Sequence, residues 1–138
     1  MTFMEFGKDH YVDVEIIDEQ HKVIVDQINS IYKSILIIDK EAVLIKLKLL
    51  LEKLEIHFET EERLMKETRF LSYYSHKLEH DRFYNQILKK TEQYDKGVEQ
   101  IGTEQLKGIR NWFFNHIELN DRKFGKYLVD HGETHLIK

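Results

Sequence analysis

The chain has 138 residues, the size of one domain with a sizeable core, and its net charge of −4 does not suggest a polyanion such as nucleic acid as a partner. The absence of cysteine excludes disulfides, thiolate ligands and thiol nucleophiles, and the absence of proline favours long helices. No apolar run is long enough for membrane insertion and the first residues lack the features of a signal peptide, so we expect a cytoplasmic protein.

The first part of the chain predicts an extended arm followed by a helix. Apolar residues alternate with polar ones towards the end of residues 1–17, which we expect to pack as an arm across the body of the domain. Asp18 resembles the N-cap of a first helix over about residues 19–37. Apolar residues recur along this helix at intervals of three and four, and His21 stands at the head of that stripe.

Three more amphipathic helices are predicted, at about residues 41–66, 73–96 and 104–130. The turns between them are short, and Thr103 is a candidate N-cap for the last helix. Short turns between long helices favour neighbours that run in opposite directions. The expected fold is therefore all-α: a single domain, 1–138, that forms an antiparallel up-down-up-down four-helix bundle with an N-terminal arm.

Each predicted helix places ligand-capable side chains where apolar ones would be expected. There are seven such candidates: His21, His57, Glu61, His76, His80, His116 and Asp121. A carboxylate in a core is costly unless a cation or a hydrogen-bond donor receives it. Five imidazoles and two carboxylates exceed what one ion of octahedral preference can use, whereas two ions bridged by the carboxylates can use them all. Mixed nitrogen and oxygen ligands favour a di-iron or di-manganese centre.

The spacing of these candidates indicates how they could act together. His57 and Glu61 are four residues apart, as are the two histidines of the third helix, so each pair points the same way and can share a metal centre. His116 and Asp121 are five residues apart, which turns them by about 140° in an ideal helix. That angle suits two ligands that reach different parts of a site better than two that chelate one ion.

Taken singly, each of these side chains has an ordinary explanation. A histidine is more often a hydrogen-bonded core or boundary residue than a ligand, and a single carboxylate usually lies on a solvated face. A histidine on the apolar stripe of every helix is difficult to explain in this way, because so many buried polar groups would need other partners. Three further histidines lie outside the helix cores and are interpreted as surface residues: His10, His131 and His135.

Four ordered motifs resemble the hemerythrin family, in particular its single-domain bacteriohemerythrins. The motifs are Ile17-Asp18-Glu19-Gln20-His21, then His57-Phe58 with Glu61-Glu62-Arg63-Leu64-Met65, then His76-Lys77-Leu78-Glu79-His80, and Trp112-Phe113-Phe114-Asn115-His116-Ile117 with Asp121. The resemblance runs from about Val14 to Leu128 and fills all seven ligand positions. Two departures are an arm with phenylalanine where relatives often have tryptophan, and a connection after Met65 that lacks the proline common there.

The resemblance implies a pair of iron ions. The histidines of the third and fourth helices would ligate one ion, and His21 and His57 the other, with Glu61, Asp121 and an oxo or hydroxo group as bridges. The iron with two histidines would keep an open position for O2. The family's oxygen pocket maps onto Ile24, Phe58, Trp112, Phe113 and Ile117.

Three classes of function follow from the resemblance. The leading hypothesis is a protein that binds O2 reversibly for storage, delivery or scavenging, with a reductase to restore the ferrous state. The second is a sensor whose partner reads O2 or redox state. The third is an enzyme that acts on peroxide or nitric oxide. Acid–base catalysis needs a titratable group near the open position, and the mapped pocket offers none, so we expect no enzymatic activity.

Overall fold

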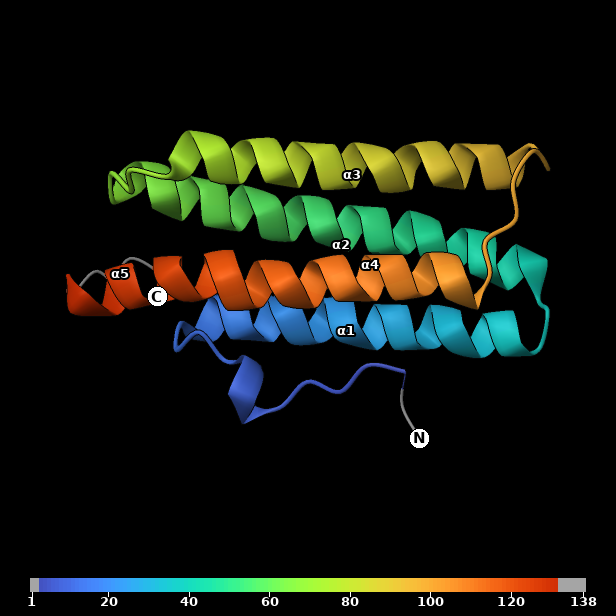
Figure 1. Cartoon of the computed structure of the whole chain (residues 1–138), viewed down its shortest axis with the longest axis horizontal. Helices are drawn as coiled ribbons and strands as arrows, with labels where there is room; N and C mark the ends of the chain where they lie inside the picture. Colours follow the sequence, from blue (N-terminus) through green and yellow to red (C-terminus); the bar gives the residue numbers. More distant parts are fainter. Residues whose placement is uncertain (1–2, 132–138) are drawn as a thin grey trace.

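The computed structural model describes residues 3–131, and this part of the chain contains helices and no strand. Figure 1 shows four long rods side by side, each running opposite to the one before it in the chain, so the predicted all-α up-down-up-down bundle is confirmed. The helical elements are η1 (Lys8–His10), α1 (Glu15–Leu36), α2 (Lys40–Glu67), α3 (Tyr73–Asp95), α4 (Thr103–His116), η2 (Ile117–Asp121) and α5 (Arg122–Asp130). The short segments η2 and α5 continue the rod of α4 (Figure 1).

Helix α1 begins four residues earlier than the sequence pattern suggested. Val14 occupies the N-cap position, and the predicted cap Asp18 lies in the first turn. The carboxylate of Asp18 accepts a hydrogen bond from the backbone N–H of Val12 at 2.8 Å, so it fastens the end of the arm to the helix. The prediction that Asp18 caps the helix was therefore wrong, because its carboxylate bonds backwards along the chain.

The start of α4 also differs from the prediction. Thr103 is the first residue of the helix, and Gly102 precedes it at the N-cap position. The side chain of Gln105 accepts a hydrogen bond from the backbone N–H of Gly102 at 2.9 Å. A side chain from the first turn thus reaches back to the N-cap residue, where the sequence suggested a cap by the hydroxyl of Thr103.

The N-terminal arm packs across α1 and α4 (Figure 1). Asn29 of α1 holds the backbone of buried Met4 with two hydrogen bonds, of 2.7 Å to its N–H and 2.9 Å to its C=O. The guanidinium of Arg110 on α4 lies 4.6 Å above the ring centre of Phe3. At the other end of the arm, a Cβ on Gly125 would lie 2.3 Å from the carbonyl oxygen of Val12, so α5 approaches the arm at a distance that only glycine allows.

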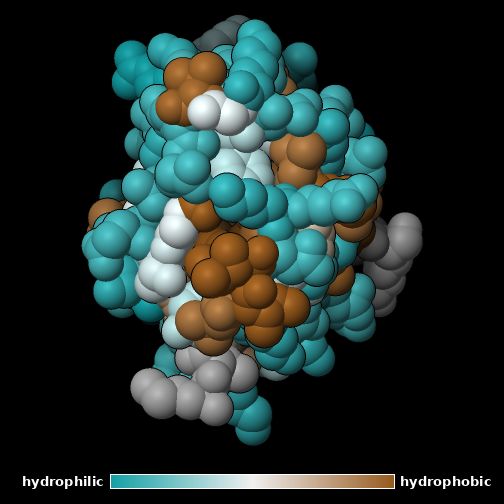
Figure 2. Space-filling model, turned by 90° about the vertical axis from the view of Figure 1, so that its right-hand side faces the viewer, coloured by the Kyte–Doolittle hydropathy of each residue, from teal (hydrophilic) through white to brown (hydrophobic). Residues whose placement is uncertain are grey.

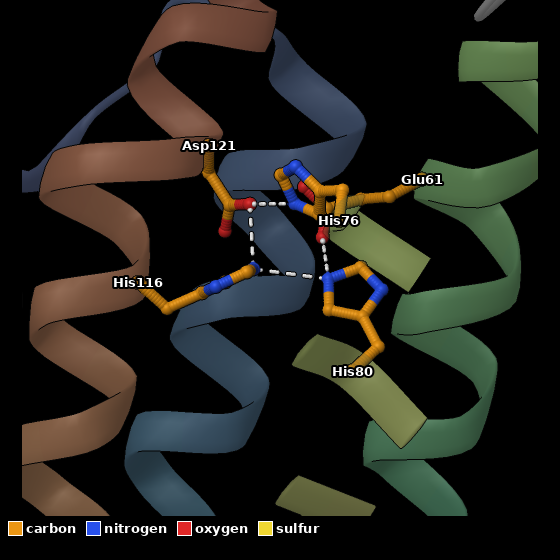
Figure 3. Close-up of side chains that lie close together, drawn as sticks. All are labelled: Glu61, His76, His80, His116 and Asp121. Atoms are coloured by element: carbon orange, nitrogen blue, oxygen red, sulfur yellow. Dashed lines mark hydrogen bonds and ion pairs between the residues drawn. The ribbon is translucent and has the colours of Figure 1, made fainter. Parts of the chain in front are cut away.

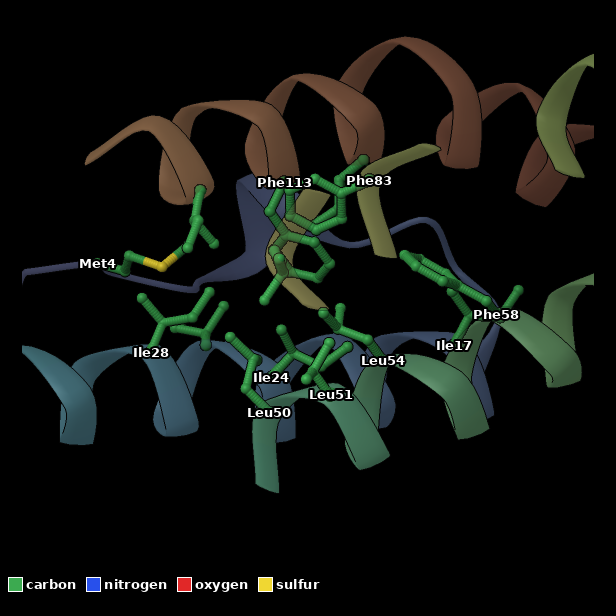
Figure 4. Packing of buried hydrophobic residues seen from close by; sticks show 14 of the residues in the cluster. Met4, Ile17, Ile24, Ile28, Leu50, Leu51, Leu54, Phe58, Phe83 and Phe113 are labelled. Carbon is green, nitrogen blue, oxygen red and sulfur yellow. The ribbon is translucent and has the colours of Figure 1, made fainter. Parts of the chain in front are cut away.

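The apolar stripes of the four rods meet in one continuous core (Figure 4). Leucines spaced by three and four residues along α2, among them Leu47, Leu50 and Leu54, are almost completely buried. Phe113 of α4 and Phe124 of α5 are fully buried as well. This core fills the middle of the bundle, and the histidine-bearing stretches lie towards the end where α1 starts and α2 ends.

The opposite end of the bundle carries the α1–α2 turn. Figure 2 shows apolar side chains gathered on this end face, where Leu36, Ile37 and Ile38 are exposed. Ile38 has a backbone φ of 55°, which is uncommon for a β-branched residue. Among the described residues, no helix combines the length and the apolarity needed to cross a membrane.

Candidate metal centre

The antiparallel order of the helices brings four short stretches together at one end of the bundle. These are the start of α1, the end of α2, the start of α3 and the end of α4 with η2. Each stretch contributes at least one candidate ligand from its core-facing stripe. All seven expected ligands are buried: His21, His57, Glu61, His76, His80, His116 and Asp121.

Five of these side chains form what we call the three-histidine group, which consists of Glu61, His76, His80, His116 and Asp121 (Figure 3). The Nε2 atoms of His76 and His116 lie 3.0 and 3.1 Å from Oδ1 of Asp121. Nε2 of His80 lies 2.9 Å from Nε2 of His116 and 3.4 Å from Oε1 of Glu61. One donor atom from each residue can be chosen so that all five lie within 4.8 Å of one another, close enough to surround an ion.

The second set, the two-histidine group, consists of His21 and His57 with the same two carboxylates, Glu61 and Asp121. Nε2 of His21 lies 2.9 Å from Oδ2 of Asp121, and Nε2 of His57 lies 3.1 Å from Oε1 of Glu61. Asp121 therefore presents one oxygen to each group. The arrangement offers two adjoining ion positions with both carboxylates common to them.

The pairing of His116 with Asp121 corrects one conclusion drawn from the sequence. Their five-residue spacing was expected to direct them to different parts of the site. The chain between them forms a π-helical turn, η2, in which the N–H of Arg122 bonds to the carbonyl of Ile117, five residues back. In such a turn residues five apart lie on the same side of the helix, so both side chains join the three-histidine group.

Several inward-facing atoms have no hydrogen-bond partner among the described residues. They are Nε2 of His57 and both carboxylate oxygens of Glu61; Nδ1 of His21, on the outer side of its ring, has no partner either. A fully buried carboxylate without a directed donor is costly, and native structures rarely leave such groups unsatisfied. Metal ions between the inward nitrogens and the Glu61 oxygens would satisfy them. By this test the residues present fit a metal centre.

Hydrogen bonds on the outer side of His57 fix which of its nitrogens faces the centre. The hydroxyl of Thr60 donates to the carbonyl of Ile56 at 2.9 Å, so it can only accept from the Gln20 amide NH2, which lies 3.1 Å away. The amide oxygen of Gln20 is then left to accept from Nδ1–H of His57 at 2.8 Å. Nε2 of His57 consequently carries a free lone pair directed at the centre.

Two histidines of the three-histidine group, His80 and His116, have a carboxylate near the outer nitrogen. Nδ1 of His80 lies 2.9 Å from Oε2 of Glu62. Nδ1 of His116 lies 3.1 Å from the amide nitrogen of Asn120 and 3.3 Å from Oε2 of Glu79, to which the same amide donates a hydrogen bond. Such outer partners set the tautomer and the ring orientation of a ligating histidine and raise its basicity.

Sequence reasoning did not assign roles to these outer residues, although each is a direct neighbour of a candidate ligand. Gln20 precedes His21 in the chain, Glu62 follows Glu61, and Glu79 precedes a ligand of α3. Successive residues of a helix point about 100° apart, so a polar neighbour of an inward ligand faces the adjacent helix. Each of these three residues contacts a histidine of the next helix. A polar residue directly beside a buried candidate ligand could therefore have been predicted to contact the histidine of the next helix.

The electrostatics of the cluster keep its carboxylates ionised. Burial alone would raise the pKa of both carboxyls, but the facing histidines hold the pKa of Glu61 at about 2 and that of Asp121 well below its ordinary value. Burial lowers the pKa of His57. It would also lower those of His80 and His116, but nearby carboxylates raise them, to about 9 for His80. The metal-free core thus holds ionised carboxylates beside protonated imidazoles, and a metal must displace those protons.

Three of the five residues that were expected to line an oxygen pocket contact histidines of this cluster. Phe58 stacks on His80 with ring centres 3.9 Å apart, and Trp112 stacks on His116 at 4.6 Å. The ring of Phe113 meets a histidine of the two-histidine group edge to face. Four of the five pocket residues are buried: Ile24, Phe58, Phe113 and Ile117. Aromatic rings therefore pack directly against His80, His116 and His21.

The remaining histidines lie apart from the cluster. His10 is half-buried, because its ring stacks between Phe114 at 4.6 Å and Phe6 at 5.6 Å, so its interpretation as a simple surface residue was wrong. His131 is exposed, as expected. His135 falls outside the described residues.

Comparisons with known proteins agree with the geometry. The family model described as "Hemerythrin HHE cation binding domain" matches residues 12–128. The chain is 26% identical over 127 residues to a bacteriohemerythrin of Methylococcus capsulatus, covering 92% of this chain and 94% of that protein. It is 29% identical over 139 residues to a bacteriohemerythrin of Pseudomonas aeruginosa, covering 100% and 89%. A crystal structure of wild-type hemerythrin has the same fold, with a TM-score of 0.86, 23% identity, and coverage of 90% of this chain and 96% of that one.

Proposed function

The chain belongs to the hemerythrin family, and we propose that it is a non-haem di-iron protein that binds O2 reversibly for storage, delivery or scavenging. The observation that carries the proposal is that two groups of buried donors share both of their carboxylates, Glu61 and Asp121. Adjoining ions need bridging ligands of this kind, whereas a single ion would need only one of the groups. Imidazole and carboxylate ligands without thiolates suit iron.

In this proposal each group holds one ion. The three histidines of the three-histidine group would ligate the first iron and His21 and His57 the second, and Glu61, Asp121 and an oxo or hydroxo group would be common to both. The irons, when bound, supply the two electrons that O2 takes up and returns. The two-histidine group has one histidine fewer, so its ion keeps room for an external ligand.

The surrounding side chains keep water and protons away from that position. Phe113 and Ile117 are fully buried, and Phe58 is nearly so. An apolar lining of this kind favours release of O2 as such, because proton donors that would promote irreversible oxidation are excluded. None of the proposed pocket residues titrates near neutral pH, which supports a binding protein over an enzyme.

The same chemistry could serve a sensor, in which O2 or redox state alters a surface that a partner reads. A carrier needs a reductase to return oxidised irons to the ferrous state, and we expect both proteins in the cytoplasm. The carrier and sensor roles share the metal centre. They differ in how long the O2-bound form lasts and in whether a partner binds one redox form selectively.

Iron analysis and optical spectra over repeated O2 cycles test the proposal. We expect two irons per chain and a coloured form that O2 induces and vacuum reverses. Rapid irreversible oxidation with release of peroxide would instead support an enzyme or a redox sensor. Purified protein that takes up no iron under reducing, anaerobic conditions would overturn the di-iron assignment itself.

A further inference from the structure

The two groups of donors differ in the charge that lies behind their histidines. On the three-histidine side, His80 contacts the carboxylate of Glu62 at 2.9 Å. Nδ1 of His116 lies 3.3 Å from the carboxylate of Glu79 and 3.1 Å from the neutral amide of Asn120. On the two-histidine side, His57 contacts the neutral amide oxygen of Gln20 at 2.8 Å. The outer nitrogen of His21 has no hydrogen-bond partner, and the carboxylate of Asp18, which accepts a hydrogen bond from Val12, acts on His21 only through space. Both carboxylates in contact with outer nitrogens therefore belong to one group.

Nearby cations do not cancel this difference. Lys77 approaches Glu62 at 3.6 Å, but its ammonium also pairs with Asp81 at 3.1 Å, so its charge is shared between two carboxylates. The side chain of Glu62 is only 15% exposed, which limits screening of its charge by solvent. Glu79 is 48% exposed and contributes less, although the amide of Asn120 holds it against His116.

A carboxylate behind a ligating histidine acts on a bound metal in two ways. It raises the basicity of the coordinating nitrogen through the shared proton, and it adds negative charge close to the ion. Both effects stabilise the more positive oxidation state. An amide oxygen accepts the same hydrogen bond but supplies no net charge, so Gln20 orients His57 without this electronic effect.

We propose that Glu62 and Glu79 fix the order in which the two irons are oxidised, so that a single ferric ion occupies the three-histidine position and the two-histidine position stays ferrous. The inference rests on the proposed di-iron function. In the first oxidation the iron at the three-histidine position loses one electron to an outer-sphere oxidant such as ferricyanide. No ligand or proton needs to leave the site. The order keeps the last ferrous iron at the position with room for an external ligand.

Reduction potentials of charge variants test this order. Glu62→Gln and Glu79→Gln keep the size of each side chain and remove its charge. We expect each to raise the potential of the first oxidation, with a change of about tenfold in its equilibrium constant for the more buried Glu62 and less for Glu79. Glu59→Gln is the matched control. It removes the same charge from the same helix, but Glu59 is exposed to solvent. Shifts no larger than that of the control would overturn the proposal.

Gln20→Glu supplies the opposite change, since it puts a carboxylate behind His57. We expect it to favour the ferric state at the two-histidine position. The Nδ1–H protons of histidines bound to ferric iron resonate far downfield of those bound to ferrous iron, so NMR of the singly oxidised protein reports which histidines share the ferric ion. Three such resonances are expected in the unaltered protein, and two when Gln20→Glu is combined with Glu62→Gln and Glu79→Gln, because the carboxylate behind an outer nitrogen then lies on the two-histidine side. Two in the unaltered protein would contradict the proposed order.

Iron content separates failure of this inference from failure of the proposed function. If every variant binds two irons and cycles O2, but the potentials follow the control, only the order of oxidation is wrong. If the unaltered protein binds no iron, both proposals fall. Thermal unfolding of each iron-loaded variant checks that a change in potential does not come from a damaged fold.

Discussion

Nε2 of His116 lies 3.1 Å from Oδ1 of Asp121 although five positions separate the two residues along the chain. The π-helical turn η2 between them produces this approach. Helical turns of this kind are frequent at functional sites. Here the turn also sets the rotation of α5, whose Phe124 and Leu128 are fully buried. The geometry of the candidate ligands and the packing of the last helix thus depend on the same irregular turn.

Replacement of the shared carboxylate Glu61 should cost the protein both iron and stability. We expect Glu61→Ala to hold less iron than the unaltered protein, because both donor groups include this residue. Since metal binding stabilises the folded state, the variant should also lose the stabilisation that iron adds, about 2.7 kcal/mol where free iron is about 100 times its dissociation constant. Iron per chain and unfolding with and without iron measure the two effects.

The exposed neighbour Glu59 provides the control for this prediction, since Glu59→Ala alters the same residue type on the same helix outside the cluster. It should keep its iron and its iron-dependent stabilisation. Full iron content in Glu61→Ala would show that this carboxylate is not a shared ligand.

The periodicity of the sequence predicted the helices and the inward position of the candidate ligands, because a buried stripe recurs every three to four residues whatever the neighbouring helices are. It did not predict η2, since that reasoning assumed ideal α-helical geometry between His116 and Asp121. Nor did it predict the contact between Gly125 and Val12, which depends on how the arm folds back over α5. Neither the turn η2 nor the contact at Gly125 follows from the spacing of apolar residues along a single helix.

The residues behind the candidate ligands could be predicted only in part from the sequence. The contacts of Gln20, Glu62 and Glu79 follow from the helix order, because each residue adjoins a ligand and faces the next helix. Their polar character was visible in the sequence, but their partners were not, since the same side chains would be suitable for a solvated face. Knowledge of which helices are adjacent resolves that ambiguity.

The metal-free protein should depend more strongly on pH than the iron-loaded protein. In the metal-free protein nearby glutamates raise the pKa of His80 to about 9 from 6.5, against the effect of burial. The resulting stability is fully present below pH 6.5 and is lost as pH rises towards 9. The pKa of Glu61, lowered to about 2 from 4.5, contributes fully throughout this range. Metal-free protein should therefore become less stable between pH 6.5 and 9.

Iron requires deprotonated ligands, so its binding strengthens as the pH rises through the same window. We expect the stability difference between loaded and metal-free protein to increase with pH. Urea unfolding of both forms across this range measures it. A difference that stays constant would mean that iron does not displace protons from these histidines.

The hydroxyl of Thr60 should influence metal affinity although it lies outside the cluster. Thr60→Val keeps the side-chain shape and removes the group that fixes the Gln20 amide, so His57 loses its defined tautomer. Loss of such an outer contact typically weakens metal binding about 10- to 100-fold. Competition with a chelator should detect weaker binding of one of the two ions. Thr60→Ser should restore the affinity, and equal affinity in all three proteins would contradict the role of the hydroxyl.

Two glycines should respond to alanine in opposite directions. At Gly125 a Cβ would lie 2.3 Å from the carbonyl oxygen of Val12, so the arm and α5 must move apart. We expect Gly125→Ala to destabilise the protein by about 1–3 kcal/mol, the usual cost of overpacking. At Gly108, which is exposed within α4, a Cβ would meet nothing within 4 Å. Gly108→Ala should therefore stabilise the protein by about 0.5–1 kcal/mol through helix propensity.

Denaturant unfolding of the two variants in metal-free form compares these effects without a contribution from iron. Because η2 connects α5 to the metal centre, displacement of α5 in Gly125→Ala should also weaken iron binding through Asp121, whereas Gly108→Ala should leave it unchanged. Equal stability changes in the two variants would show that the arm does not restrain α5. A destabilised Gly125→Ala that binds iron with unaltered affinity would show that η2 holds Asp121 in place without the packing of α5 against the arm.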